Sequence, residues 1–268
     1  MIAALKIIFL LGFLILIHET GHYAVARLCK IKVNEFAIGF GPKIWSKAKN
    51  GTTYEIRLIP LGGFVSLEGE QEHSDEGSFN TENKKNEKEL KNSMPFYKAS
   101  IPKRIAVIAA GALVNIIFGL LLYFILIAMR YVTIINNSIM EAVKYSFTVS
   151  TELIGSMLQG MAGIFIGKFT LNDMTGPVGI SSMVSQTNGI IEFLYLLSII
   201  SVSLGITNLL PIIPLDGGKI ILLIIEAMRK RPLKQEVEAK INSIGFIILI
   251  FFSLIVTCND LTKLIKWN

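Results

Sequence analysis

The chain has 268 residues and a formal net charge of +6, with 52% hydrophobic residues, 17% charged residues and a mean hydropathy of +0.57. This composition excludes an ordinary soluble domain and indicates a membrane protein with several spans. The basic excess does not indicate nucleic-acid binding, because no basic patch is interleaved with aromatic residues. The first apolar run has no small-residue cleavage site, so we expect it to be retained as a span.

The sequence predicts an all-α polytopic membrane protein with about four transmembrane helices and a small β-hairpin or sheet inserted after the first helix. We expect a single domain over residues 1–268. Its expected segments are a first span at 1–29, a cytoplasmic-side β region at 30–68, a polar loop at 69–100, a second span at 101–130, an extracytoplasmic connection at 131–190, a third span at 191–210, a helix-breaking segment with a cytoplasmic loop at 211–240, and a fourth span at 241–258.

The first span contains the sequence HETGH at positions 18–22. On a helix, residues four apart project from nearly the same face, because four residues turn about 400°. His18 and His22 can therefore bind one metal ion, and Glu19 can take a proton from a water molecule on that metal. Ionisable groups within an apolar span are costly and indicate function. That setting disfavours the alternative of a chance match whose histidines meet polar partners.

Residues 30–68 alternate polar and apolar side chains, and Asn50-Gly51 between two such runs is a strong hairpin signal. We expect two or three short strands. The exposed edge of such a sheet can pair with an extended peptide, or the sheet can simply cap the helix bundle. In the polar loop that follows, His73 is expected to be an exposed histidine and not a ligand.

Asn115 is the one polar side chain in the middle of the second span. It can hydrogen-bond to a neighbouring helix, or it can approach the metal site. The connection at 131–190 is expected to contain an amphipathic helix, either lying on the membrane surface or partly embedded.

The sequence NLLPIIPLDGG at 208–218 ends the third span and places Asp216 between helix-breaking prolines and glycines. Backbone broken in this way must be protected from lipid by other protein or by a water-filled cavity. A catalytic zinc ion needs three protein ligands and one open position, and Asp216 is the best third candidate beside the two histidines. The alternative of a capping or turn aspartate would be favoured only if the motif stood alone.

The distribution of basic residues predicts the topology. Residues 27–104 hold 14 of the 26 Lys and Arg residues, whereas 130–190 hold three. The positive-inside rule therefore places the first and third connections in the cytoplasm and both termini outside. His18 and Asp216 then lie at similar depth, provided that residues 139–169 do not cross the membrane. Cys29 and Cys258 would lie on opposite sides, so we expect neither a disulfide nor a cysteine metal site.

On these motifs the chain resembles the site-2 protease family of intramembrane zinc metalloproteases, peptidase family M50. It most resembles the bacterial regulator-of-sigma-E-like branch, whose members cut membrane-bound anti-sigma factors and remnant signal peptides. The resemblance covers nearly the whole chain, and further family-like features lie at 39–42, Tyr54, 59–64, 110–115 and 176–179.

The resemblance implies one Zn²⁺ ion on His18, His22 and Asp216, with Glu19 as general base. It also implies Asn208 as a secondary site residue that holds the substrate or the developing oxyanion. Two features depart from the family pattern. The connection at 131–190 is too short for the PDZ domain that many members carry there, and Ala112 stands where proline is common.

We therefore expect an intramembrane zinc metalloendopeptidase of the bacterial cytoplasmic membrane that cuts in or near transmembrane segments. Its expected partners are transmembrane substrates and the lipid bilayer, without nucleic acid, and the sequence names no regulatory partner. One alternative is a catalytically inactive client-binding relative, which the intact Glu19 disfavours. A metal transporter is disfavoured because the chain has only three histidines. A membrane-anchored conventional metalloprotease would need a soluble catalytic domain.

Overall fold

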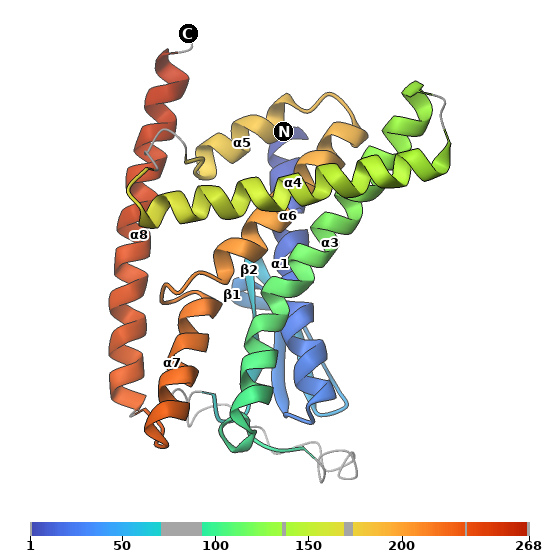
Figure 1. The fold of residues 1–268 in the computed structure, drawn as a ribbon. Helices are drawn as coiled ribbons and strands as arrows, with labels where there is room; N and C mark the ends of the chain where they lie inside the picture. Colours follow the sequence, from blue (N-terminus) through green and yellow to red (C-terminus); the bar gives the residue numbers. More distant parts are fainter. Residues whose placement is uncertain (1, 71–92, 136–137, 169–173, 234, 267–268) are drawn as a thin grey trace.

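The computed structural model describes residues 2–70, 93–135, 138–168, 174–233 and 235–266. Most of the predicted polar loop, including His73, lies outside the described residues. In chain order the elements are α1 (Ile2–Leu28), β1 (Val33–Lys49), β2 (Thr52–Leu67), the short 3-10 helix η1 (Phe96–Lys98), α3 (Ile101–Ile135), α4 (Ile139–Phe165), α5 (Pro177–Gln186), α6 (Ile190–Asn208), α7 (Asp216–Arg229) and α8 (Gln235–Lys266) (Figure 1).

Four helices, α1, α3, α6 and α8, are long and apolar enough to cross a membrane. This confirms the predicted all-α polytopic fold with a small β insertion. Both termini lie at the same end of the bundle, as an even number of crossings requires (Figure 1). The helices α3 and α8 extend beyond the predicted spans, because a helix does not have to end where its apolar stretch ends.

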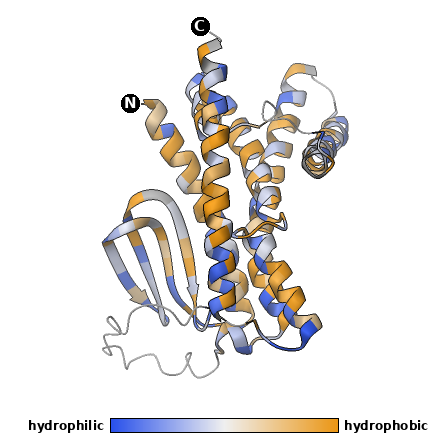
Figure 2. Ribbon diagram, turned by 90° about the vertical axis from the view of Figure 1, so that its left-hand side faces the viewer, coloured by the Kyte–Doolittle hydropathy of each residue, from blue (hydrophilic) through white to orange (hydrophobic). Residues whose placement is uncertain are grey.

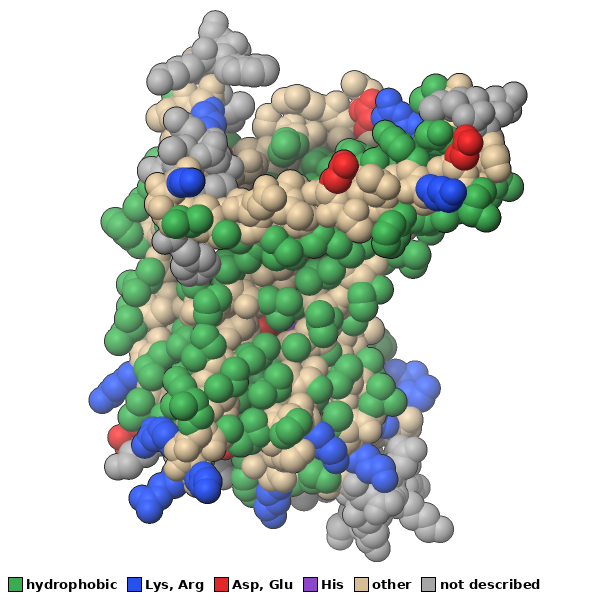
Figure 3. Space-filling view, viewed as in Figure 1, with side chains coloured by type: hydrophobic (Ala, Val, Ile, Leu, Met, Phe, Trp, Pro, Cys, Tyr) green, Lys and Arg blue, Asp and Glu red, His purple; other side chains and the backbone are tan. Residues whose placement is uncertain are grey.

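The helix α4 is not among the four candidate spans and runs across them (Figure 1). It has three faces. Ala142, Ser146 and Ser150 are buried, a second face exposes large apolar side chains such as Phe147, and a third carries charges such as Glu152. This pattern favours a surface-lying amphipathic helix. Charged side chains gather along the upper edge and at the base of the molecule, with a hydrophobic belt between them (Figure 3).

The β region consists of two long, bent strands instead of the two or three short ones expected. Asn50 and Gly51 have φ values of 51° and 75° and form the predicted hairpin turn. Phe36 of β1 lies opposite Val65 on one side and Tyr54 on the other, so both ends of β2 pair with the same part of β1. The sheet therefore folds back on itself and lies beside the helix bundle (Figure 2).

An aromatic cluster attaches this sheet to α1. The Tyr23 ring lies 5.5 Å from the Phe36 ring, and the Tyr23 and Tyr54 hydroxyls are 2.6 Å apart. Burial, together with the hydrogen bond to Tyr23, raises the pKa of Tyr54 to about 12, so Tyr54 stays protonated at physiological pH. The sheet is thus fixed alongside the helix that carries the HETGH sequence.

A single carboxylate joins α8 to the start of α5. Asp260 is 3% exposed, and its Oδ2 accepts hydrogen bonds from the backbone N–H groups of Gly176 at 2.9 Å and Gly179 at 2.8 Å. Since these N–H groups belong to the first turn of a helix, the carboxylate also compensates the positive end of the helix dipole.

Replacing Asp260 with Ala is expected to lower the free energy of unfolding by about 3 kcal/mol, because both N–H groups lose a charged acceptor. Unfolding of the purified protein in detergent measures this loss. Thr262→Ala is the matched control on the same helix, since the Thr262 hydroxyl bonds the Asn259 carbonyl of its own helix one turn earlier, at 2.8 Å. Equal stability of the two variants would contradict the role given to Asp260.

Candidate metal centre

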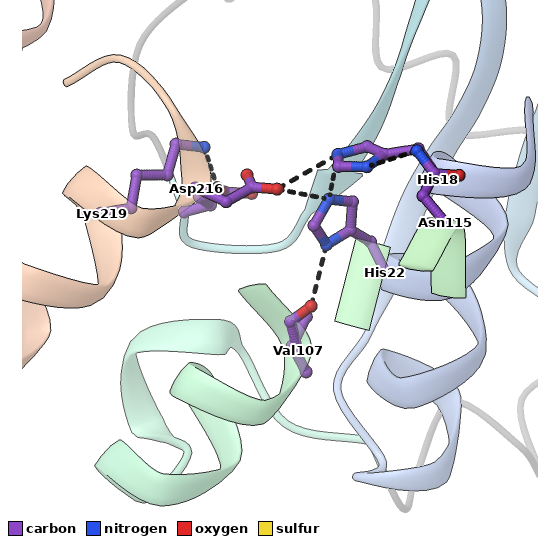
Figure 4. A network of polar contacts seen from close by, with 7 residues as sticks. His18, His22, Val107, Asn115, Asp216 and Lys219 are labelled. Carbon is purple, nitrogen blue, oxygen red and sulfur yellow. Dashed lines mark hydrogen bonds and ion pairs between the residues drawn. The ribbon is translucent and has the colours of Figure 1, made fainter. Parts of the chain in front are cut away.

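Three ligand atoms from two distant parts of the sequence converge at one point (Figure 4). His18 Nε2 and His22 Nε2 lie 3.1 Å apart on α1. Asp216 Oδ2, at the start of α7, lies 3.1 Å from His18 Nε2 and 3.4 Å from His22 Nε2. Among the described residues, these form the group of histidine, cysteine and acidic side chains that could hold a metal ion.

The distances between the three ligand atoms match those expected around a tetrahedrally coordinated metal ion. Ligands bound about 2.0–2.1 Å from zinc in tetrahedral geometry lie about 3.3 Å from one another. Asp216 Oδ2 is buried and accepts no hydrogen bond from the residues that the structure describes. Its lone pairs are thus available to a cation. The three side chains as a whole are 12–14% exposed.

The path of the chain between α6 and α7 explains the two glycines after Asp216. The backbone returns so closely over the start of α7 that a Cβ on Gly217 would lie 2.2 Å from the Leu210 carbonyl oxygen. A Cβ on Gly218 would lie 2.7 Å from the Ile212 oxygen. The prediction of a helix-breaking segment and a loop at 211–240 missed one element, since this range contains the helix α7. A helix of 14 residues is too short to span a membrane.

The imidazole of His22 is oriented by the backbone of α3. His22 Nδ1 lies 2.8 Å from the Val107 carbonyl oxygen, which can only accept a hydrogen bond. Nδ1 therefore carries the proton, and Nε2 keeps its lone pair for a metal. A backbone carbonyl is present at every position, so no residue type in the sequence could have indicated this contact.

Asn115 approaches the site from α3, which is one of the two roles left open for it. It is completely buried, and its Nδ2 lies 3.5 Å from His18 Nδ1. It also meets the neighbouring helix α6, because its backbone carbonyl accepts a hydrogen bond from the Ser201 hydroxyl at 2.8 Å. Asn208 is the last residue of α6 and is half-buried, and its role stays a prediction.

Glu19 lies on the side of the centre that faces the sheet. A Cβ on Gly63 of β2 would lie 3.2 Å from Glu19 Cγ, so the β2 backbone passes directly beside this side chain. Glu19 is half-buried and lies between the two histidines in the sequence of α1. The candidate base therefore lies next to an extended strand.

Two ion pairs made by residues of α7 were not found from the sequence. Lys219, one turn after Asp216, lies 3.2 Å from Glu70, and Arg104 on α3 lies 2.7 Å from Glu226 on α7. All four border a cavity of about 540 Å³. The partners in each pair are far apart in the chain, so the sequence did not indicate that they meet. The one signal in the sequence was that Lys219 follows Asp216 by three residues. The second pair fixes α7, and with it Asp216, against α3.

Replacing Arg104 with Leu is expected to cost about 3 kcal/mol of unfolding free energy, since Glu226 would remain largely buried without its partner. The double replacement Arg104→Leu/Glu226→Leu is expected to cost less than the sum of the two single changes. A double-mutant cycle of detergent unfolding measures the coupling. Strict additivity would show that the pair does not fix α7.

Known proteins that are similar to this chain in sequence are zinc metalloproteases. The sequence model of Peptidase family M50 matches residues 6–252. The zinc metalloprotease RasP of Bacillus licheniformis is 26% identical over 410 aligned positions, which cover 96% of this chain and 98% of the relative. The regulator of sigma-W protease RasP of Bacillus subtilis is 25% identical over 411 positions, covering 96% and 97%. The alignments are much longer than this chain, which is compatible with a missing PDZ domain.

Proposed function

The chain belongs to peptidase family M50 and is an intramembrane zinc metalloendopeptidase, and on this premise we propose that His18, His22 and Asp216 bind the zinc ion and that Glu19 is the general base. The observation that carries the proposal is the convergence of three ligand atoms from α1 and α7 at the spacing of a tetrahedral ion. The family match also favours a peptidase over the metal transporter that the sequence left open.

The residues divide the chemistry among them. A bound zinc ion supplies Lewis-acid chemistry, polarising a peptide carbonyl and acidifying water. Glu19 accepts a proton from the attacking water and passes it to the amide nitrogen as the carbon–nitrogen bond breaks. The Val107 carbonyl keeps His22 in the tautomer that leaves Nε2 unprotonated. Asn208 remains a candidate for holding the substrate carbonyl.

We further propose that the substrate lies as an extended strand along residues 62–67 of β2. A transmembrane helix must unwind before cleavage, because its carbonyls are engaged in internal hydrogen bonds. The register pairs residues 63–67 with β1 along one side, and Gly63 in this segment adjoins Glu19. An added strand there would pass the general base. The sheet lies alongside α1, which disfavours a role as a mere cap on the bundle (Figure 2).

The substrate class and topology follow from the same site. We propose membrane-bound anti-sigma factors and remnant signal peptides as substrates, in line with the sigma-factor regulation named for the Bacillus subtilis relative. We also propose a place in the bacterial cytoplasmic membrane with both termini outside. The basic side chains gathered at the base of the molecule, opposite the termini, support this orientation (Figure 3).

The metal proposal is tested on the purified protein in lipid nanodiscs with a model transmembrane substrate. Removing zinc with a chelator is expected to abolish cleavage, and adding zinc back is expected to restore it. His22→Ala and Asp216→Ala are each expected to lose both bound zinc and cleavage. Full zinc content in the Asp216→Ala variant would exclude Asp216 as a ligand.

The strand proposal is tested by photo-crosslinking from two serines of the same sheet. A photoreactive residue at Ser66, on the segment beside Glu19, is expected to capture the substrate. The same residue at Ser46, on the far edge of the sheet, is expected to capture none. Equal capture at both positions would exclude strand addition at 62–67.

A further inference from the structure

The helix α3 supplies none of the three candidate ligands, yet it contacts both histidines. Val107 meets His22 through its backbone carbonyl, and Asn115, two turns further along α3, meets His18 through its side chain (Figure 4). Each contact is made to Nδ1, the ring nitrogen that faces away from the point of convergence. The two histidines are thus supported from the same helix in the same way.

The contact between Asn115 and His18 places two hydrogen-bond donors opposite each other. With Nε2 available to a metal, Nδ1 of a neutral imidazole carries the proton and is a donor. Asn115 presents Nδ2, which is also a donor, at 3.5 Å. Two donors facing each other do not form a hydrogen bond. Meanwhile Asn115 Oδ1 is buried and has no partner within the described part of the chain.

One rotation resolves both problems. The oxygen and nitrogen of a side-chain amide have nearly the same shape, so a half-turn about the last bond exchanges them without other movement. Oδ1 then faces His18 Nδ1–H and accepts a hydrogen bond from it. The buried oxygen gains a partner, and the two donors are separated.

The position of Asn115 is tightly held, so the amide stays opposite His18. The residue is completely buried, and the Ser201 hydroxyl of α6 bonds its backbone carbonyl at 2.8 Å. Close approach of α3 and α6 continues one turn away, where a Cβ on Gly205 would lie 2.5 Å from the Ala112 carbonyl oxygen. The side chain therefore cannot swing out of the interface.

We propose that Asn115 is a positioning residue whose Oδ1 accepts a hydrogen bond from His18 Nδ1–H and thereby keeps Nε2 unprotonated for zinc. This inference rests on the zinc site proposed above. An amide suits the place better than a carboxylate would in one respect, because it adds no further negative charge within the membrane beside Asp216 and Glu19. Asn115 acts through His18 and does not touch the substrate.

The test measures zinc affinity of the purified protein in nanodiscs by competition with a chelator, independently of cleavage. Asn115→Leu keeps the approximate volume but has no acceptor, and it is expected to bind zinc about 10–100-fold more weakly. Asn115→Asp keeps an acceptor and is expected to bind zinc at least as tightly as the wild type. Ser198→Ala is the control, because it removes another buried polar group of the α3–α6 interface, one that bonds the Tyr195 carbonyl at 2.6 Å.

Unchanged affinity in Asn115→Leu, or an equal loss in Asn115→Leu and Asn115→Asp, would overturn the inference. Asn115→Ala, which adds no bulk, replaces the leucine variant if that variant does not fold. A wild-type protein that binds no zinc would overturn the proposed zinc site and this inference together. A wild type that binds zinc and cleaves, beside a Leu variant of equal affinity, would overturn the role of Asn115 alone.

Discussion

Glu19→Gln is expected to reduce cleavage of a transmembrane substrate by at least about 10²–10⁴-fold, the usual contribution of a general base, while zinc stays bound. Glutamine has the shape of glutamate but cannot accept the proton of the attacking water. The ligand atoms of His18, His22 and Asp216 are untouched by the change. Cleavage in nanodiscs and zinc content measured on the same preparation separate the two effects.

The neighbouring Thr20 provides the control for Glu19. It is exposed, and its hydroxyl bonds the Leu16 carbonyl of its own helix at 2.6 Å. Thr20→Val is therefore expected to retain both zinc and cleavage. A zinc-loaded Glu19→Gln variant that cleaves at the wild-type rate would exclude Glu19 as the base and leave the metal ligands unaffected.

The candidate ligands could be predicted because their chemistry fixes their spacing. Two histidines four residues apart share a helix face by geometry alone, and an ion with three protein ligands then requires one more. Asp216 was recognisable because ionisable and helix-breaking residues are rare in apolar segments. The prediction that these three side chains converge used only the expected depth of His18 and Asp216 in the membrane. It did not use the packing between α1 and α7.

The supporting contacts were harder to predict, since they depend on backbone and on distant packing. Val107 acts through a carbonyl that every residue has, and the amide of Asn115 is equally suited to a helix interface and to a histidine. The path of the sheet was also missed. Gly39 and Gly62 have φ values of 90° and 133°, and these bends let two long strands fold back where shorter ones were expected.

A single methyl group on α3 is expected to disrupt the metal centre. The helices α1 and α3 cross so closely that a Cβ on Gly21 would lie 2.6 Å from the Ala110 carbonyl oxygen. At the same crossing, a Cβ on Gly111 would lie 2.4 Å from His22 Nε2, the nitrogen that faces the other two ligand atoms. Neither the α3 backbone nor the ring can keep its position once a methyl group stands there.

Gly111→Ala is therefore expected to lower cleavage by at least about 10²-fold, because a displacement of about 1 Å at a catalytic group has that effect. Bound zinc should fall with it, which distinguishes this variant from Glu19→Gln. Gly155→Ala on α4 is the matched control, since a Cβ there meets nothing within 4 Å and alanine favours a helix by about 1 kcal/mol. Wild-type zinc affinity in Gly111→Ala would mean that α1 and α3 can separate without loss of the site, and the positioning role given to α3 would then fail as well.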